Sequence, residues 1–258
     1  MSTWILLRGL TRETRHWGRL PEALREVVSG DRVLLLDLPG NGEFAGLRAP
    51  ARVTDMVDFV RLAARRAGAA APYSVLAMSL GGMVATDWAQ RHPQEIERLV
   101  LINTSMRPFS RMTERLRPSA WPALLRVARR WGDAPRAERD IHRLTCNNVE
   151  TLGADLDAWS AIRRSAPVSR GNALRQLCAA ARFTAGAAKP DCPLLILSSR
   201  ADHLVNPVCS TKLAAAWRAM HIEHAWAGHD LPHDDAAWTS EQVRSWLAQT
   251  QAEPKPVL

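Results

Sequence analysis

Short runs of Leu, Val and Ile recur along this 258-residue chain, and stretches with helical spacing separate the early ones. This alternation constrains the fold most, because a strand, a helix and a further strand in succession build a parallel α/β sheet. The helical stretches cover residues 15–28, 54–67 and 83–91. We expect strands at residues 4–7, 33–36, 74–78, 99–103, 194–198 and 221–226.

The alternation stops in the middle of the chain. From residue 107 to residue 188 no strand pattern appears, and Arg, Ala, Leu and Trp follow helical spacing interrupted by prolines. Strand-like residues return at Leu194. The economical interpretation is an α/β core of about six strands, built from residues 1–106 and 189–258, with an all-helical cap, residues 107–188, inserted in it.

The net charge of +8 is concentrated in this predicted cap. Between Arg107 and Arg182 there are 15 arginines and 7 acidic residues, so the rest of the chain is neutral. A basic surface attracts acidic proteins, anionic substrates or nucleic acid. Nucleic-acid binding ranks low, because no recognition motif accompanies the high isoelectric point.

Composition sets limits on location and cofactors. No window approaches the ~18 uninterrupted apolar residues of a membrane helix, and the N-terminus has no basic lead before its apolar run, so we expect a cytoplasmic protein. The cysteines are far apart, with no CxxC spacing and no nearby His pair at ligand spacing, which predicts reduced thiols rather than a disulfide framework or a zinc site. They are Cys146, Cys178, Cys192 and Cys209.

The run YSVLAMSLGG, residues 73–82, ends on a lone serine followed shortly by two glycines. With a strand before it and a helix after it, the segment Ala77-Met78-Ser79-Leu80-Gly81 fits the nucleophile elbow G-x-S-x-G, except that Ala77 replaces the first glycine. In such an elbow a strained turn projects the serine hydroxyl into a pocket. Serine alone is a poor nucleophile, so a base and an orienting acid are required.

Two later segments supply both groups in the expected order. LLILSSRADHLVNP, residues 194–207, delivers Asp202 beyond a strand, and AGHDLP, residues 227–232, delivers His229 beyond the next. Ligands bind at this carboxyl edge of open α/β sheets. Asp230 and Asp191 are alternative carboxylates. Other serines and histidines fit structural or surface roles better: Ser198, Ser199, His203, His221, His224 and His233.

In these three motifs the chain resembles the α/β-hydrolase superfamily, from Trp4 to about Leu247 apart from the helical insertion. The resemblance implies that Ser79 is the nucleophile, His229 the general base and then acid, and Asp202 the carboxylate that orients the imidazole. It also implies an oxyanion hole of two backbone N–H groups. We assign these to Leu80 and Leu10, with Thr11 as the alternative to Leu10.

Two residues depart from the superfamily pattern. Arg8-Gly9 stands where the oxyanion loop usually has His-Gly, which changes the local charge but keeps the main-chain donor. Ala77 in place of glycine tightens the elbow. The segment DLPGNG, residues 37–42, resembles a DxPGxG loop of the superfamily, and we interpret it as a structural turn.

The resemblance predicts hydrolysis of a carboxylic ester through an acyl-serine, without metal or cofactor. Apolar cap residues that fit a substrate channel are Trp121, Trp131, Trp159, Leu124, Leu125, Leu152 and Phe183. The basic cap is similar to that of pimeloyl-carrier-protein methyl ester esterases, which dock an acidic acyl-carrier protein. Docking arginines would then be Arg126, Arg129, Arg130, Arg139, Arg143, Arg163 and Arg164.

Other activities fit the same three residues. A thioesterase, a carbon–carbon bond hydrolase and a cofactor-free haloperoxidase all use such a triad. A receptor that keeps the fold without turnover belongs to a different class, whose usual mark, a broken triad, is not found here. The sequence leaves open the choice of ester or thioester and of a small or carrier-bound substrate.

Overall fold

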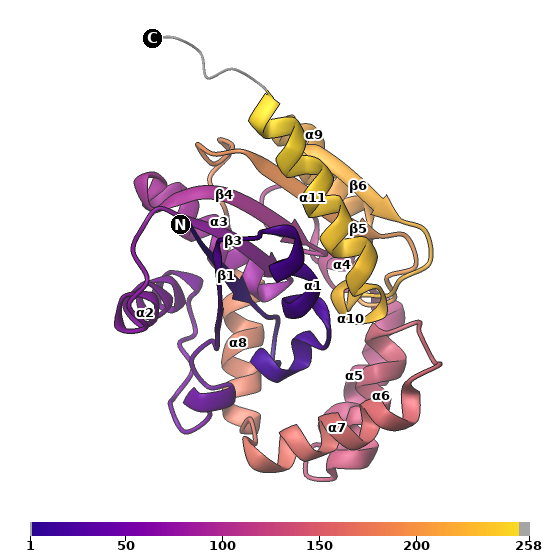
Figure 1. Ribbon diagram of the computed structural model, residues 1–258. Coiled ribbons are helices and arrows are strands. Elements are labelled where there is room, and N and C mark those ends of the chain that lie inside the picture. The colour runs from indigo at the N-terminus through magenta and orange to yellow at the C-terminus, as the bar shows by residue number, and fades with distance from the viewer. Residues whose placement is uncertain (1, 253–258) are drawn as a thin grey trace.

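Six parallel strands form one sheet in the order β2-β1-β3-β4-β5-β6 in the computed structural model, which describes residues 2–252 (Figure 1). The predicted sheet of about six strands is confirmed. The last strand ends at His224, two residues before its predicted end. The strands are β1 (Thr3–Leu7), β2 (Arg32–Leu36), β3 (Tyr73–Met78), β4 (Ile96–Ile102), β5 (Leu194–Ser199) and β6 (Met220–His224).

Helices cover both faces of the sheet, so the central strands are apolar along their whole length. In β1, Ile5 and Leu7 enter one core and Trp4 and Leu6 the other. The first core is closed by α2 (Val53–Arg66), α3 (Leu80–Arg91) and α9 (Val208–Trp217), the second by α1 (Leu20–Val27) and α11 (Ala236–Ala252). Short helices complete the core: η1 (Thr14–Trp17), η2 (Gly42–Phe44), η3 (Pro93–Glu95) and α10 (Leu231–Asp234).

The segment between β4 and β5 is helical, as predicted. Its helices are α4 (Met112–Arg115), η4 (Pro118–Ala120), α5 (Trp121–Arg129), α6 (Ala134–Thr145), α7 (Leu152–Ser165) and α8 (Arg170–Arg182). A single β-bridge between Arg107 and Thr184 joins the two ends of the insertion. Its division from the core at residues 107 and 188 stays a prediction.

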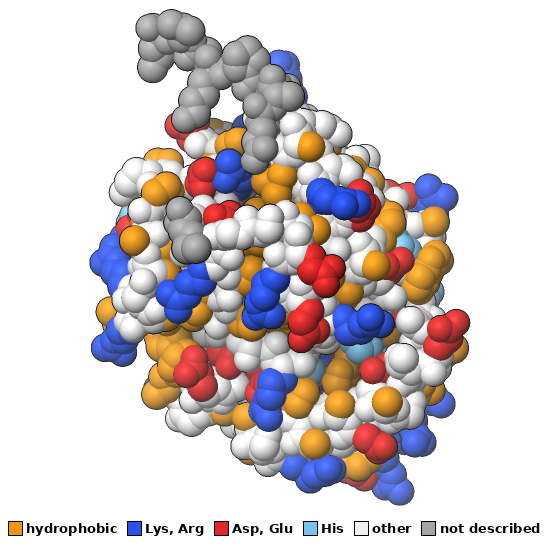
Figure 2. Space-filling model, viewed as in Figure 1, with side chains coloured by type: hydrophobic (Ala, Val, Ile, Leu, Met, Phe, Trp, Pro, Cys, Tyr) orange, Lys and Arg blue, Asp and Glu red, His pale blue; other side chains and the backbone are white. Residues whose placement is uncertain are grey.

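Helices α5, α6 and α7 of the insertion form one end of the molecule, below the sheet in Figure 1. Lys and Arg side chains gather along the same edge of the surface in Figure 2. In the part of the chain that the structure describes, no helix combines the length and apolarity needed to cross a membrane. The fold thus places a basic, helical layer next to the strand ends that carry the three predicted catalytic motifs.

Candidate active site

Ser79 lies at a strained turn between β3 and α3. Its φ of +54° and ψ of −116° are uncommon for a residue with a side chain. Two hydrogen bonds fix this turn: Ser79 N–H donates to the Ile102 carbonyl (3.0 Å), and the Ser79 carbonyl accepts from Thr104 Oγ1 (2.8 Å). Gly81 lets α3 start close to β1, because a Cβ there would lie 2.4 Å from the Leu7 carbonyl oxygen.

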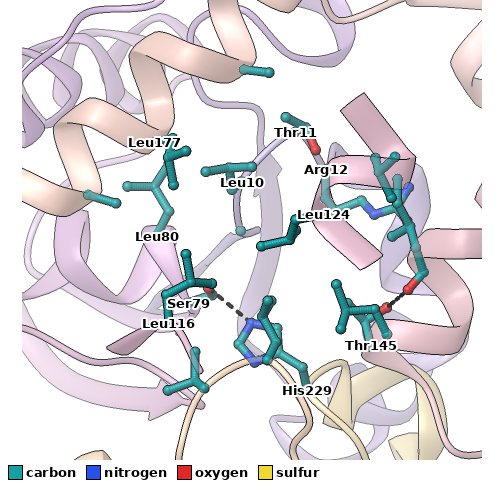
Figure 3. A pocket seen from close by; sticks show the side chains of 18 of the residues that line it. Leu10, Thr11, Arg12, Ser79, Leu80, Leu116, Leu124, Thr145, Leu177 and His229 are labelled. Carbon is teal, nitrogen blue, oxygen red and sulfur yellow. Dashed lines mark hydrogen bonds between the residues drawn. The ribbon is translucent and has the colours of Figure 1, made fainter. Parts of the chain in front are cut away.

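The three residues predicted to form a triad lie in one hydrogen-bonded line. His229 Nε2 is 3.1 Å from Ser79 Oγ (Figure 3). On the other side of the ring, His229 Nδ1 is 2.7 Å from Asp202 Oδ2. The other oxygen of Asp202 accepts the N–H groups of Leu204 and Val205, at 2.7 and 2.8 Å. Asp202 and His229 are buried. This geometry allows His229 to take the Ser79 proton while Asp202 holds the imidazole in place.

The alternative residues are not part of this hydrogen-bonded line. Asp230 is paired with Arg8, and Asp191 is exposed. Ser198 Oγ is 2.8 Å from His221 Nε2, and Ser199 Oγ accepts from Asn103. The other histidines, His203, His224 and His233, make no hydrogen bond to Ser79 or Asp202 within residues 2–252.

The two predicted oxyanion donors, Leu80 and Leu10, flank Ser79 in the pocket wall (Figure 3). Within the described residues, no protein acceptor takes the backbone N–H of either residue. The alternative donor is already used, because Thr11 N–H donates to Gln176 Oε1 at 2.9 Å. This occupancy favours Leu10 over Thr11, and the oxyanion hole itself stays a prediction.

Ser79 and His229 open into a cavity of about 510 Å³ with a mainly apolar lining. Side chains from the core and the insertion close it, among them Leu10, Leu80, Leu116 and Leu177 (Figure 3). Of the seven residues expected to line a channel, only Leu124 and Trp131 do so. The others lie outside it: Trp121 and Leu125 are exposed, Trp159 and Phe183 are buried in other clusters, and Leu152 is not part of the lining.

A family model described as serine aminopeptidase, S33 (Hydrolase_4) matches residues 5–233. The chain belongs to this family. It is therefore a member of the α/β-hydrolase superfamily, as the three motifs predicted.

Two curated relatives match parts of this α/β-hydrolase. It is 36% identical over 92 residues to the pimeloyl-[acyl-carrier protein] methyl ester esterase of Chromobacterium violaceum, covering 36% of this chain and 34% of that protein. It is 32% identical over 105 residues to the biotin biosynthesis bifunctional protein BioHC of Teredinibacter turnerae, covering 40% of this chain and 17% of that protein. The alignments thus span about a third or less of the relatives' length.

Solved structures show the same fold over nearly the whole hydrolase chain. A membrane phospholipase A, described as a bacterial virulence factor, is 20% identical with a TM-score of 0.79, covering 98% of this chain and 80% of its own. The enol-lactonase of Burkholderia xenovorans is 20% identical with a TM-score of 0.75, and the match covers 96% of this chain and 91% of the lactonase chain. At these identities the likeness concerns the fold alone.

A buried ion pair joins the predicted oxyanion loop of the hydrolase to the loop that carries His229. Arg8 Nη1 and Nη2 donate to the two oxygens of Asp230, at 2.9 and 2.6 Å, and the guanidinium lies 4.8 Å from the centre of the Trp17 ring. Burial alone would raise the pKa of Asp230, but the charge and hydrogen bonds of Arg8 outweigh it and lower this pKa to about 2. Sequence reasoning noted Arg8 as a departure and missed its partner.

Gln176, on the cap helix α8, holds the oxyanion loop and was not predicted. It is fully buried. Its oxygen accepts the Thr11 N–H, and its Nε2 donates to Asn41 Oδ1 (2.8 Å) and the Pro39 carbonyl (3.3 Å). The Gln176 side chain therefore links the 37–42 turn to the oxyanion loop by hydrogen bonds. Nothing in a helical pattern distinguishes this glutamine from a surface one.

Asn103 supports the loop that carries His229. It follows β4 with a φ of +44°, and its Nδ2 donates to the His229 carbonyl at 2.8 Å. Its Oδ1 accepts the Ser199 N–H at 2.9 Å. The sequence predicted a strand that ends at Asn103. It did not reveal that the Asn103 side chain supports the loop of His229.

The candidate docking arginines divide into two groups. Arg163 points inward: its Nη1 is 2.8 Å from Glu138 Oε1, and its guanidinium lies 4.1 Å from the centre of the Trp131 ring. Arg130 pairs with Asp140 at 2.9 Å. Because Arg163 is turned inward, we remove it from the docking set, whereas Arg130 is exposed although it is paired. The other five are exposed and make no ion pair with any residue that the structure describes: Arg126, Arg129, Arg139, Arg143 and Arg164.

Proposed function

We propose that this α/β-hydrolase cleaves carboxylic esters through an acyl-Ser79 intermediate. The observation that carries the proposal is the hydrogen-bonded line from Asp202 through His229 to Ser79, at the wall of an apolar cavity. A cavity of this size falls within the usual range for small-molecule sites. Its apolar lining suits an acyl chain, and the strained serine faces the space where an ester carbonyl would lie.

In the first half of the reaction, Ser79 Oγ attacks the ester carbonyl carbon and its proton passes to His229 Nε2. Asp202 accepts a hydrogen bond from His229 Nδ1–H and stabilises the imidazolium that forms. The negative charge on the carbonyl oxygen is bound by the N–H groups of Leu80 and Leu10. When the tetrahedral intermediate collapses, His229 returns the proton to the leaving alkoxide, which departs as an alcohol and leaves the acyl group on Ser79.

In the second half, water takes the place of the alcohol. His229 removes one proton from the water, and the hydroxide attacks the acyl-serine carbonyl. Collapse of the second intermediate releases the carboxylic acid and returns the proton to Ser79 Oγ. The sequence of steps consumes one water and needs no redox partner.

The test combines a fluorophosphonate probe with p-nitrophenyl esters of increasing acyl length. We expect the probe to label Ser79 and the esters to be hydrolysed, and Ser79→Ala to lose both properties. Ser105 lines the same cavity and provides the control, since Ser105→Ala should still be labelled. Labelling of Ser79→Ala, or undiminished hydrolysis by it, would overturn the assignment.

A carrier-bound ester is the substrate that we favour within this class. Its support is the similarity to a pimeloyl-[acyl-carrier protein] methyl ester esterase together with the exposed arginines of the cap. An acidic carrier protein would meet this positive face by electrostatic attraction, which salt screens. The apolar cavity would then receive the acyl chain while the carrier stays outside.

The docking experiment compares two triple variants on two substrates. One variant replaces three cap arginines by Gln: Arg126, Arg129 and Arg139. The control replaces three exposed arginines of the α/β part of the chain in the same way: Arg25, Arg52 and Arg66. At low salt, we expect only the cap variant to have a raised KM for a carrier-bound methyl ester. Its KM for a free p-nitrophenyl ester should not change. Equal KM values for all three proteins at low and high salt would exclude docking by these arginines.

The same assays separate the alternative activities. Faster turnover of acyl thioesters than of oxygen esters would indicate a thioesterase. Cleavage of a vinylogous diketone or peroxide-dependent halogenation would point to the other enzymes, and binding without any turnover to a receptor. For the cellular location we propose the cytoplasm, a reducing compartment that suits four free cysteines.

A further inference from the structure

Two histidines and a cysteine meet where the cap contacts the loop that carries His229. One of the histidines, His233, follows His229 by four residues. His142 lies in α6, Cys146 follows the end of that helix, and His233 lies in α10. Their potential ligand atoms are all within 4.8 Å of one another. We call these three residues the His–Cys cluster. His142 and Cys146 are buried, and His233 is nearly so.

A carboxylate completes this group from a third helix. Asp155, in α7, places Oδ2 3.4 Å from His142 Nε2 and 3.1 Å from His233 Nε2. Nitrogen and oxygen ligands about 2.0–2.2 Å from a tetrahedral zinc ion lie roughly 3.3 Å from each other. Each imidazole thus already lies at about this spacing from the carboxylate. The thiol and the two imidazoles, whose ligand atoms lie within 4.8 Å of one another, would move closer together on binding.

An aromatic ring covers the cluster. The Trp159 ring packs against both imidazoles, with centroids 5.3 Å from His142 and 4.9 Å from His233, and shields the cluster.

The backbone around the cluster is held in place without a metal. Asp230 N–H donates to the Thr145 carbonyl at 2.7 Å, and the Asp234 carboxylate accepts the N–H groups of Asn147 and Asn148 at 2.9 to 3.1 Å. Gly228 packs so closely here that a Cβ would lie 2.6 Å from the Thr145 carbonyl oxygen. A preformed scaffold reduces the ordering that a ligand must impose on binding.

We propose that His142, Cys146 and His233, with Asp155 beside them, bind a borderline divalent transition ion of the zinc class. Nitrogen and sulfur ligands select such ions over Mg²⁺ and Ca²⁺. On binding, the thiol of Cys146 loses its proton to solvent and the thiolate forms the metal bond. The ion would link α6 of the cap to α10 of the core, and the proposal is independent of the esterase proposal.

The predicted absence of a zinc site rested on spacing along the chain. His142 and Cys146 are four residues apart, and the second histidine is brought to them only by the folded contact between cap and core. The proposal reverses that expectation on the basis of this contact. It concerns a structural site, because no residue of the cluster is hydrogen-bonded to Ser79 or His229 in the described chain.

The probe is Co²⁺, added to the reduced, chelator-treated full chain. We expect saturation at one equivalent, with the absorption of a thiolate-to-cobalt charge-transfer band. The band should vanish in Cys146→Ser and persist in Cys178→Ser, a matched change of a cysteine outside the cluster. His233→Ala should weaken Co²⁺ binding by tenfold or more, on the order of the loss seen when a metal site is damaged.

Zn²⁺ should displace the band in the wild type and raise its Tm, whereas Mg²⁺ should do neither. Fluorophosphonate labelling and circular dichroism check that each variant is folded. A wild-type protein that shows no charge-transfer band at saturating Co²⁺ overturns the proposal, whether or not the variants fold. So does a band that survives Cys146→Ser or disappears in Cys178→Ser, since either result places the metal on another cysteine.

Discussion

Arg8 and Asp230 form a buried, two-pronged ion pair that ties the oxyanion loop to the residue following His229. Their side chains are only 2% and 3% exposed, so neither charge has water as a substitute partner. Breaking a buried pair on one side leaves an uncompensated charge, which costs more than removing both partners. The pair therefore fixes the relative position of the predicted oxyanion loop and the loop that carries His229.

Asp230→Asn should lower the free energy of unfolding by about 3–5 kcal/mol, because it leaves the Arg8 guanidinium buried without a negative partner. Replacing both, as Arg8→Met with Asp230→Leu, should recover most of this loss. Urea unfolding of the three proteins measures it. If the double variant is as unstable as Asp230→Asn, packing rather than charge explains the effect.

The same pair predicts a pH dependence of stability. The fold lowers the pKa of Asp230 to about 2, so the ionised form stabilises the folded state above the ordinary pKa of 3.8. This contribution is lost as the pH falls through the folded value. The stability difference between wild type and Asp230→Asn should be constant near neutral pH and shrink below about pH 4. A difference that does not change on acidification would contradict the assigned pKa.

Gln176→Met should reduce kcat about tenfold with little change in KM, since it removes the support of the Thr11 N–H and lets the adjacent Leu10 donor drift. Complete loss of an oxyanion donor costs about 10²–10³. Asn172 is the matched control, because it ties the same helix to the Leu47 carbonyl and the Ala49 N–H, both at 2.9 Å, without touching the oxyanion loop. Equal kcat losses in Gln176→Met and Asn172→Ala would indicate a general effect of α8.

Gly81→Ala should destabilise the fold by about 1–3 kcal/mol and lower kcat, because the new Cβ would collide with the backbone of Leu7. Gly153 in α7 offers the contrast: it has open space, and Gly153→Ala should raise stability by about 0.5 kcal/mol through helix propensity. Thermal unfolding of Gly81→Ala and Gly153→Ala tests both expectations. A neutral Gly81→Ala would mean that α3 can move away from β1.

Much of the fold followed from local pattern. Parallel strands buried on both faces must be apolar along their length, so the six strands were visible in the sequence and the helical insertion appeared as their absence. The order Ser79, Asp202, His229 was equally local, since each residue follows a strand and the carboxyl ends of parallel strands share one edge. Strand alternation and strand-end position thus pointed to three side chains that the fold places in hydrogen-bond contact.

Other parts depended on contacts that no local pattern encodes. Arg8 and Asp230 are 222 residues apart, and Gln176 reaches Thr11 across 165 residues. Whether a cap arginine faces solvent or, like Arg163, a buried glutamate depends on how helices pack. The sequence alone determined the sheet, the elbow and the order of the candidate catalytic residues, because these follow from periodicity and strand ends. Only the tertiary structure decided which polar side chains support the site, because such pairs form where packed surfaces bring distant groups together.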